Sequence, residues 1–382
     1  MNKQETYHNT ISDYLGVHQK TIQTYWKGRV ALYTALKAMN IGQGDEVILP
    51  AFTCVVVPNA IIYLGATPVY VDIDKNSLCA SAKNIEDKLS PKTKCILIQN
   101  MLGLSFEVDE IITLASSRGI YTLEDCTHGF GGTYNGVFNG LKTDCSFYST
   151  QWNKPFSTGI GGILYVQNKD LLGKIENINK ELKTPSFKNV LNLRILLFAR
   201  TYILKNWSYW FLLRLYRRLS AIGLVVGSSS KEEIEGVQEP NNYFMGLSQV
   251  QAHNGIKALK ELNKVIEARK KNGIKINEWM QSQNKCHLSC ELIGNHSFLK
   301  FPALVKNRES FLLAAEKNKI PMGDWFTSPL HPVQDDLSQW KLNVSEFPIA
   351  QEVSRQIVNL PTDINHMDSL MRFLEKHKNE LL

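Results

Sequence analysis

The sequence has no segment that marks secretion or membrane spanning. Residues 1–15 contain no cationic stretch followed by an apolar run, so we expect no signal peptide. No uninterrupted apolar run is long enough to cross a bilayer as a helix. A paired cysteine framework is also missing, since the seven cysteines are an odd number scattered through apparent core segments. This cysteine usage is typical of a reducing compartment, and we expect a cytoplasmic protein.

Two further classes of partner have little support in the sequence. Cys286, His287 and Cys290 resemble half of a metal site, but no second pair of ligands accompanies them, so we expect no metal. The formal net charge of +7 is modest for 382 residues, and the excess falls largely in one segment instead of in arginine-rich arms. We therefore expect no nucleic-acid partner.

What the sequence does contain is an alternation, from about residue 29 to 166, of amphipathic stretches and short β-branched runs. Helices are predicted at 30–39, 55–64, 85–89 and 108–117, and strands at 46–49, 67–71, 95–98, 121–124, 145–148 and 162–166. This pattern predicts an α/β fold with a mostly parallel central sheet flanked by helices. Further along, a helix from 247 to about 279, a strand near 298–301 and a closing helix at 366–381 are predicted.

The length also predicts two domains. With 382 residues and 43% hydrophobic content, the chain can bury a large core and a second, smaller one. We expect a large cofactor-binding domain over 1–250 and a small C-terminal α/β domain over 251–382.

Polar side chains follow several of the predicted strands. Phe52 and Thr53 come after one strand, Asn100 after another, and Asp125 and His128 after a third. Parallel sheets bind ligands at the carboxyl ends of their strands, so we expect a site assembled from these loops. No Gly-x-Gly-x-x-Gly motif follows the first strand, which argues against a dinucleotide-binding Rossmann enzyme.

Asp125 and Lys154 have the chemistry that pyridoxal phosphate needs. The cofactor requires a lysine for its aldehyde, a carboxylate at its pyridine nitrogen, a phosphate cradle and a wall against its ring. Asp125 ends a strand where it can point into a cleft, although it is equally suited to capping the next loop or helix. Lys154 lies between an aromatic strand and a glycine-rich turn, a setting that can lower its pKa; the alternative is an ordinary surface lysine.

Several spaced motifs agree with this chemistry. They are IGQGDEVILP at 41–50, LGATPVYVDID at 64–74, Glu124 with Asp125, and Lys154 between Asp144 and Gly162. With these motifs in this order, nearly the whole chain resembles the DegT/StrS-type nucleotide-sugar aminotransferases, a group of fold-type-I pyridoxal-phosphate enzymes. The resemblance implies transfer of an amino group, by family analogy from glutamate, to a nucleotide-linked keto-sugar for glycan or polysaccharide biosynthesis.

The resemblance also implies roles for individual residues. Lys154 is expected to bind the cofactor covalently, Asp125 to hold the pyridine nitrogen, and Ser149 to bind the phosphate. Backbone amides at the start of the first helix are expected to bind the phosphate as well, and here these belong to Gly28, Arg29 and Val30. A helix N-terminus suits an anion because its amides are free and its dipole is positive there.

The sequence departs from the family pattern close to the cofactor. Arg29 stands where many members have threonine, and it can pair with the phosphate of the cofactor or of the substrate. His128 replaces a glutamine and is expected to stack on the ring or bond its phenolic oxygen, unless it is a satisfied core histidine. Cys54 replaces an aromatic residue, so the wall against the ring must come from Phe52, His128 or elsewhere.

The resemblance further implies a homodimer, because family sites lie at the subunit interface. In such a dimer Asn242 is expected to reach the phosphate in the neighbouring subunit. The arginine that usually follows nearby is replaced by Phe244, which puts that contact in doubt.

The substrate side of the site is predicted from fewer residues. The presence of Lys154 favours amino transfer, because relatives with histidine in its place are dehydratases. The candidate substrate contacts are Asn100, Trp325 and His331, with Trp325 stacking on a sugar face and His331 bonding a hydroxyl. The alternative for Trp325 and His331 is an aromatic core plug beside a proline turn.

A basic and aromatic insertion at about 190–226 lengthens the chain beyond what the family usually needs. Its arginines flank leucines and aromatic residues, which suits an interfacial helix on anionic lipid and a peripheral position at the inner face of the membrane. The alternative is a helical hairpin buried at the dimer interface or over the core. Two other functions stay open, namely a membrane-associated, non-catalytic scaffold of the same fold and another pyridoxal-phosphate reaction on a sugar, such as elimination.

Overall fold

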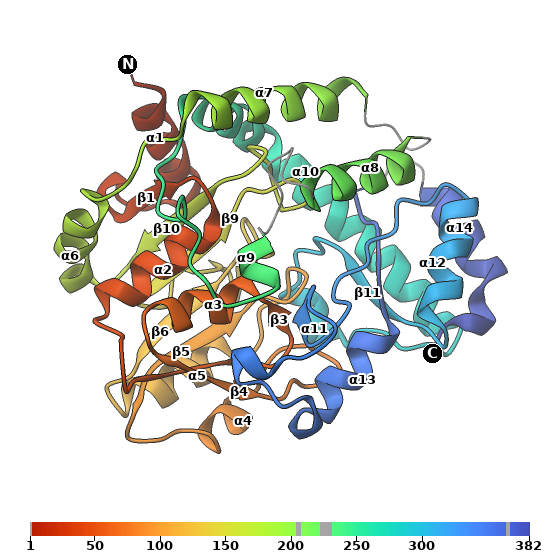
Figure 1. The fold of residues 1–382 in the computed structure, drawn as a ribbon. Helices are drawn as coiled ribbons and strands as arrows, with labels where there is room; N and C mark the ends of the chain where they lie inside the picture. The colour runs from red at the N-terminus through yellow and green to blue at the C-terminus, as the bar shows by residue number, and fades with distance from the viewer. Residues whose placement is uncertain (1, 204–207, 222–230, 364–366) are drawn as a thin grey trace.

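A seven-stranded sheet forms the centre of the computed structural model, which describes residues 2–203, 208–221, 231–363 and 367–382 (Figure 1). Its spatial order is β1-β10-β9-β6-β5-β2-β4. The strands are β1 (Ile22–Tyr25), β2 (Glu46–Pro50), β4 (Thr67–Val71), β5 (Thr93–Gln99), β6 (Tyr121–Asp125), β9 (Cys145–Ser149) and β10 (Gly162–Val166). The run from β9 to β4 is parallel, while β10 and β1 pair antiparallel at one edge. The predicted α/β fold with a mostly parallel sheet is confirmed.

Helices cover both faces of the sheet because neighbouring strand residues point to opposite sides. Val47 and Leu49 of β2 join one core cluster, while Ile48 between them joins another. The first cluster includes residues of α2 (Gly28–Ala38), α3 (Val56–Tyr63) and α6 (Lys169–Asn179), and the second includes residues of α4 (Ala82–Glu86) and α5 (Val108–Ser116). A third cluster packs α1 (Lys3–Leu15) and α10 (Gln249–Ser282) against β1 and β10.

Most predicted element boundaries agree with the structure to within two residues, and four elements do not. The closing helix predicted at 366–381 ends at Lys376, and the helix predicted to end at about 279 continues to Ser282. The helix predicted at 85–89 lies at Ala82–Glu86, because the hydroxyl of Ser81 accepts a hydrogen bond from the amide of Asn84 and starts the helix there. The strand predicted near 298–301 is β11, Phe301–Leu304. Phe298 has a φ of 50°, so the chain turns there instead of continuing as a strand.

The C-terminal part has its own core. Its elements are α11 (Cys290–Gly294), β11, α12 (Arg308–Lys317), α13 (Pro348–Gln356), β13 (Ile357–Leu360) and α14 (Met367–Lys376). Phe301, Phe311 and Phe373 lie in this core, separate from the core of the large sheet. Residues 326–357 return to the large core through Phe326, Trp340 and neighbouring side chains. The division into 1–250 and 251–382 stays a prediction, and this returning segment joins its two parts.

In the part of the chain that the structure describes, two helices belong to the insertion, and both are drawn in green in Figure 1. They are α7 (Phe187–Tyr202) and α8 (Tyr209–Ala221), and the short helix α9 (Lys231–Ile234) follows the insertion. Of the predicted insertion, residues 204–207 and 222–226 lie outside the described residues. Among the helices of the described part, none is both long enough and apolar enough to cross a membrane.

The small core provides a test of the fold. Phe311 of α12 is fully buried, whereas Leu313 on the same helix is 53% exposed. We expect Phe311→Ala to lower the free energy of unfolding by about 3–5 kcal/mol, because it leaves a cavity. Leu313→Ala is expected to change it by less than about 0.5 kcal/mol. Urea unfolding followed by tryptophan fluorescence measures both, and equal losses would contradict this packing.

Candidate functional site

A cavity of about 470 Å³ lies at the carboxyl ends of the parallel strands. Its wall includes Gln99 at the end of β5, Asp125 at the end of β6 and Ser149 at the end of β9. The volume falls in the range of roughly 300–1,000 Å³ that is typical of small-molecule sites. Several residues predicted from the sequence line this cavity, namely Gly28, Arg29, Asp125, His128, Ser149, Lys154, Trp325 and His331.

Asp125 is the last residue of β6, and it pairs with Gln99 on β5 and with Phe147 on β9. Its Oδ1 accepts a hydrogen bond of 2.9 Å from the backbone amide of Thr127. Burial raises the pKa of this carboxyl, while the bond from Thr127 and the charge of Lys154 oppose that shift. The carboxylate is therefore aimed into the cavity with an ordered partner and a cation nearby.

Lys154 lies opposite this carboxylate on the loop that follows β9. Burial lowers the pKa of its amine to about 8, although Asp125 and Cys54 act in the opposite direction. Its Nζ lies 5.0 Å from the centre of the Trp325 ring. An amine with this pKa is neutral in a large fraction of molecules near pH 8, which makes it a nucleophile and a proton acceptor.

His128 presents a flat face to the cavity. Its ring is parallel to that of Trp325, with centroids 5.3 Å apart and an interplanar angle of 3°. Burial, together with the nearby Lys154 and His331, holds its pKa well below the ordinary value of 6.5. The backbone amide of Leu102 donates to its Nδ1, so the neutral ring has its proton on Nε2. His128 is thus both a stacking surface and a hydrogen-bond donor.

The N-terminus of α2 forms a close-fitting anion cradle with Ser149. A Cβ atom added to Gly28 would lie 3.1 Å from the Cβ of Ser149, so glycine allows the two backbones to approach. The first amides of the helix and the Ser149 hydroxyl are thereby brought to one end of the cavity. These groups fit a phosphate, because a helix start offers donors and a positive dipole end.

Two cations flank this cradle, and the sequence prediction identified one of them. Lys27, immediately before the helix, lines the cavity, and burial and the nearby Arg29 lower the pKa of its amine to about 8. The guanidinium of Arg29 forms a buried ion pair with Glu233 of α9. The signal for Lys27 was available in the sequence, since a charged residue at the start of a predicted helix next to glycine can face an anion. The Glu233 contact joins residues 204 positions apart and had no local signal.

The C-terminal segment closes the opposite side of the cavity. Leu330 and His331 form a short strand, β12 (Leu330–His331), that pairs in parallel with β3 (Thr53–Cys54). The side chain of Asn359 holds Trp325 by accepting from its amide at 2.9 Å and donating to its carbonyl at 2.7 Å. Trp325 and His331 therefore come from the distant C-terminal part and face Lys154 and His128.

The remaining predicted residues do not line the cavity in the described part of the chain. Phe52 is fully buried behind the wall and packs edge to face with Phe326 at 5.0 Å. The side chain of Val30 is buried in the core, and its amide donates to the carbonyl of Lys27 at 3.2 Å. Asn242 is exposed on the surface.

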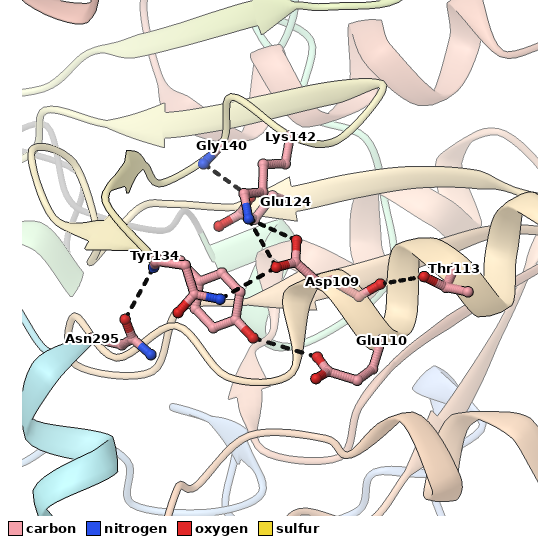
Figure 2. Close-up of polar contacts among 9 residues, drawn as sticks. Asp109, Glu110, Thr113, Glu124, Tyr134, Gly140, Lys142 and Asn295 are labelled. Carbon is pink, nitrogen blue, oxygen red and sulfur yellow. Dashed lines mark hydrogen bonds and ion pairs between the residues drawn. The ribbon is translucent and has the colours of Figure 1, made fainter.

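Asn100 lies behind the cavity wall and contacts the residue next to Asp125. It is buried, and its amide nitrogen donates to Glu124 at 2.9 Å and to Ser105 at 3.0 Å. The second carboxylate oxygen of Glu124 accepts from the amide of Gly140 at 2.9 Å, as Figure 2 shows beside the ion pair of Lys142 and Asp109. Glu124 precedes Asp125, so this network orders the end of β6.

Comparisons with known proteins agree with the geometry. The sequence model described as the DegT/DnrJ/EryC1/StrS aminotransferase family matches residues 2–194 and 212–369. The GDP-perosamine synthase of Escherichia coli O157:H7 is 40% identical over 154 residues, which are 40% of this chain and 42% of that relative. The chain thus matches less than half of that relative's length.

Solved structures show the same fold over nearly the full length. An aminotransferase from Psychrobacter cryohalolentis aligns with a TM-score of 0.74 and 19% identity, covering 100% of this chain and 92% of that one. A GDP-4-keto-6-deoxymannose-3-dehydratase, solved with a trapped PLP-glutamate geminal diamine, has the same TM-score and identity with 98% and 92% coverage. At this identity the likeness is one of fold, which is that of the pyridoxal-phosphate aminotransferases.

The lowered pKa of Lys154 gives a prediction for its reactivity. Above the pKa the amine is neutral, so labelling of Lys154 by a small amine-reactive reagent should rise with pH and reach half its maximum near pH 8. Peptide mass spectrometry over a pH series measures this, and it resolves Lys27, for which we expect a similar midpoint. In urea-unfolded protein the same peptides should follow the ordinary lysine value of about 10.4. Identical profiles in folded and unfolded protein would contradict the burial of the amine.

Proposed function

The chain belongs to the DegT/DnrJ/EryC1/StrS aminotransferase family, and on that premise we propose that it transfers an amino group, with pyridoxal phosphate as cofactor, to a nucleotide-linked keto-sugar. The observation that carries the proposal is the meeting of Lys154, Asp125 and Ser149 at the strand ends around one cavity. The lowered pKa of Lys154 supports a reactive amine and not an ordinary surface lysine.

The residues of the cavity fit the cofactor. Asp125 would hold the ring nitrogen in its protonated form, and the Nε2 proton of His128 would reach the phenolic oxygen. The start of α2 and Ser149 would hold the phosphate, together with Lys27. When bound, pyridoxal phosphate supplies an electron sink and a carbonyl group that can take up an amino group.

Lys154 would then act on the reacting carbons. Its Nζ would hold the cofactor in the resting protein, and once freed it would move a proton to and from the sugar carbon. Burial keeps part of this amine neutral near pH 8, so it can accept that proton and return it. Trp325 faces the same amine and would cover the sugar from the C-terminal side.

The substrate class rests on the named relatives. GDP-perosamine synthases from three bacteria are among the proteins similar to this chain, and their name refers to an amino sugar attached to a nucleotide. By analogy with these relatives, we propose that this protein uses a nucleotide-linked keto-sugar as acceptor and glutamate as donor. The product would serve glycan or polysaccharide biosynthesis. The trapped glutamate adduct in the dehydratase structure is consistent with that donor in this fold.

Assembly and location complete the proposal. Asn242 is exposed, and its neighbour Tyr243 is buried with its hydroxyl donating to the carbonyl of Arg29 at 3.1 Å. Asn242 is thereby held on the surface near the phosphate cradle, where it can reach a second subunit of a homodimer. The seven cysteines are all free, in keeping with action in the cytoplasm, and we place the enzyme there as a peripheral protein at the inner face of the membrane.

Lys27 gives a prediction for cofactor affinity. Lys27→Met is expected to weaken pyridoxal phosphate binding by about tenfold to a hundredfold, because a charge-assisted hydrogen bond of about 1.5–3 kcal/mol is lost. Binding of pyridoxal, which has no phosphate, should change little. Lys37→Met is the matched control, since Lys37 lies in the last turn of α2, outside the cavity lining, and pairs with Glu181 on the surface. Equilibrium dialysis measures all four combinations, and equal losses for both ligands would argue against phosphate binding by Lys27.

Lys154 gives the test of the activity itself. The wild type, reconstituted with pyridoxal phosphate, should show a visible absorption band that glutamate removes, and Lys154→Ala should lose at least about a hundredfold in the rate of that change. Lys142→Ala is the control, because Lys142 does not line the cavity and pairs instead with Asp109.

The outcomes of this test separate the alternatives. A protein that takes up no cofactor after reconstitution would leave a non-catalytic scaffold as the better explanation. Cofactor binding with loss of a hydroxyl from the sugar, and no nitrogen gained, would indicate elimination. Mass spectrometry of the sugar product after incubation with glutamate distinguishes these reactions.

A further inference from the structure

Helix α7 has apolar side chains on more than one side. On its inner side Leu193 is fully buried, and Leu197 packs on the same cluster, next to Trp152. The guanidinium of Arg200 lies 5.6 Å from the centre of the Trp152 ring and closes this contact. The outer side of α7 is apolar as well, and an exposed apolar helix face indicates a binding partner.

The outer side of α7 presents a continuous row of large, exposed side chains. They follow one another at intervals of three or four residues, so they share one face of the helix. Their exposed fractions are 80% for Phe187, 43% for Leu191, 57% for Ile195, 61% for Phe198 and 67% for Tyr202. We call this row the α7 stripe. With 16 residues the helix is about 24 Å long, and Figure 1 shows it along the edge of the molecule.

The charged residues of the segment that carries the α7 stripe are all basic, and of these Arg200 lies over Trp152 on the inner side while Arg214 pairs with Glu316 of α12. Between residues 187 and 221 the sequence contains seven basic residues and no acidic residue; they are Lys188, Arg194, Arg200, Lys205, Arg214, Arg217 and Arg218. Lys188 and Arg194 are exposed, and their positions on the helix place them beside the stripe. On α8, Phe211 is 64% exposed and Leu215 40% exposed, with Arg218 exposed one turn further on.

We propose that the α7 stripe docks on an anionic lipid surface. Apolar and aromatic side chains enter the boundary between headgroups and acyl chains, while lysine and arginine bind the anionic headgroups. The helix is amphipathic in this sense without being able to span the bilayer, since no described helix meets that requirement. Exposed apolar patches of this kind mark an interaction site.

A second copy of the chain fits this face less well than lipid does. In a twofold dimer the same surface meets itself, so the basic residues of the two copies would face one another without an acidic partner from this segment. A nucleic acid would use the positive charges but gain nothing from exposed phenylalanine, isoleucine and leucine. An anionic membrane uses both features.

The docking face is connected to both parts of the molecule. Through Leu193 the helix packs on the cluster that contains Trp26 and Ile160, while Trp210 of α8 donates to the carbonyl of Ile320 at 3.2 Å. Trp152, which α7 covers, precedes Lys154 by two residues. A lipid surface bound by α7 would therefore lie next to the loop that positions the reactive lysine.

Vesicle flotation of the full-length protein tests this proposal. The vesicles are pure phosphatidylcholine in one arm and equal parts phosphatidylcholine and phosphatidylglycerol in the other. The variants are the double substitution Ile195→Asp with Phe198→Asp, the charge reversal Arg194→Glu, and the control Leu313→Asp, which changes an apolar residue 53% exposed on α12. Circular dichroism and the absorption band of bound cofactor check that each variant is folded.

We expect the wild type and Leu313→Asp to float with the anionic vesicles and not with the neutral ones. The stripe variant should lose at least about tenfold in vesicle affinity, since two apolar side chains that would enter the lipid are replaced by anions. Arg194→Glu should weaken binding, more so at low salt than at high salt. Failure of the wild type to float, or equal flotation of wild type and stripe variant, would overturn the proposal. Conversion of an oligomer to a monomer by the stripe variant, seen in analytical ultracentrifugation without vesicle binding, would overturn it in favour of a second copy.

Discussion

The site depends on one amine that the fold keeps out of water. Lys154 follows the central strand β9, and burial lowers its pKa to about 8 in spite of the nearby carboxylate of Asp125. A buried ammonium is costly unless it is paired, so a neutral amine becomes accessible near physiological pH. Asp125 is held at the end of β6 by its pairing with Gln99 and by a hydrogen bond from Thr127. Its charge raises the pKa of Lys154, but by less than burial lowers it.

The C-terminal segment covers the side of the cavity opposite Lys154 and Asp125. The short pairing of β12 with β3 brings His331 beside the loop after β2, and Asn359 fixes the backbone of Trp325 from the small core. The ring of Trp325 then lies parallel to His128 and near the amine. The large core carries the strand ends that line the cavity, and residues 326–357, which pack on that core, carry Phe326 and His331 to the other side of the cavity.

The insertion adds the α7 stripe, the surface that we propose for lipid docking, to this frame. The family match stops at residue 194 and resumes at 212, within the insertion, so the end of α7 and the connection to α8 are where this chain departs from its relatives. The inner side of α7 is built into the molecule around Trp152, while the outer side carries the α7 stripe. Glu233 of α9, which follows the insertion, forms an ion pair with Arg29 beside the cavity.

The sequence by itself determined the elements and the positions of the main chemical groups. Strand and helix periods are local, so β2, β4, β6 and β10 could be predicted, and a polar residue after a parallel strand, such as Asp125, must lie at the ligand-binding edge. Only the tertiary structure decided which groups meet. Arg29 was expected at a phosphate and pairs with Glu233, Asn100 was expected at the substrate and binds Glu124, and Trp325 lies over His128. These contacts join residues far apart in the chain, and their geometry follows from the packing of cores and not from any local spacing of residue types.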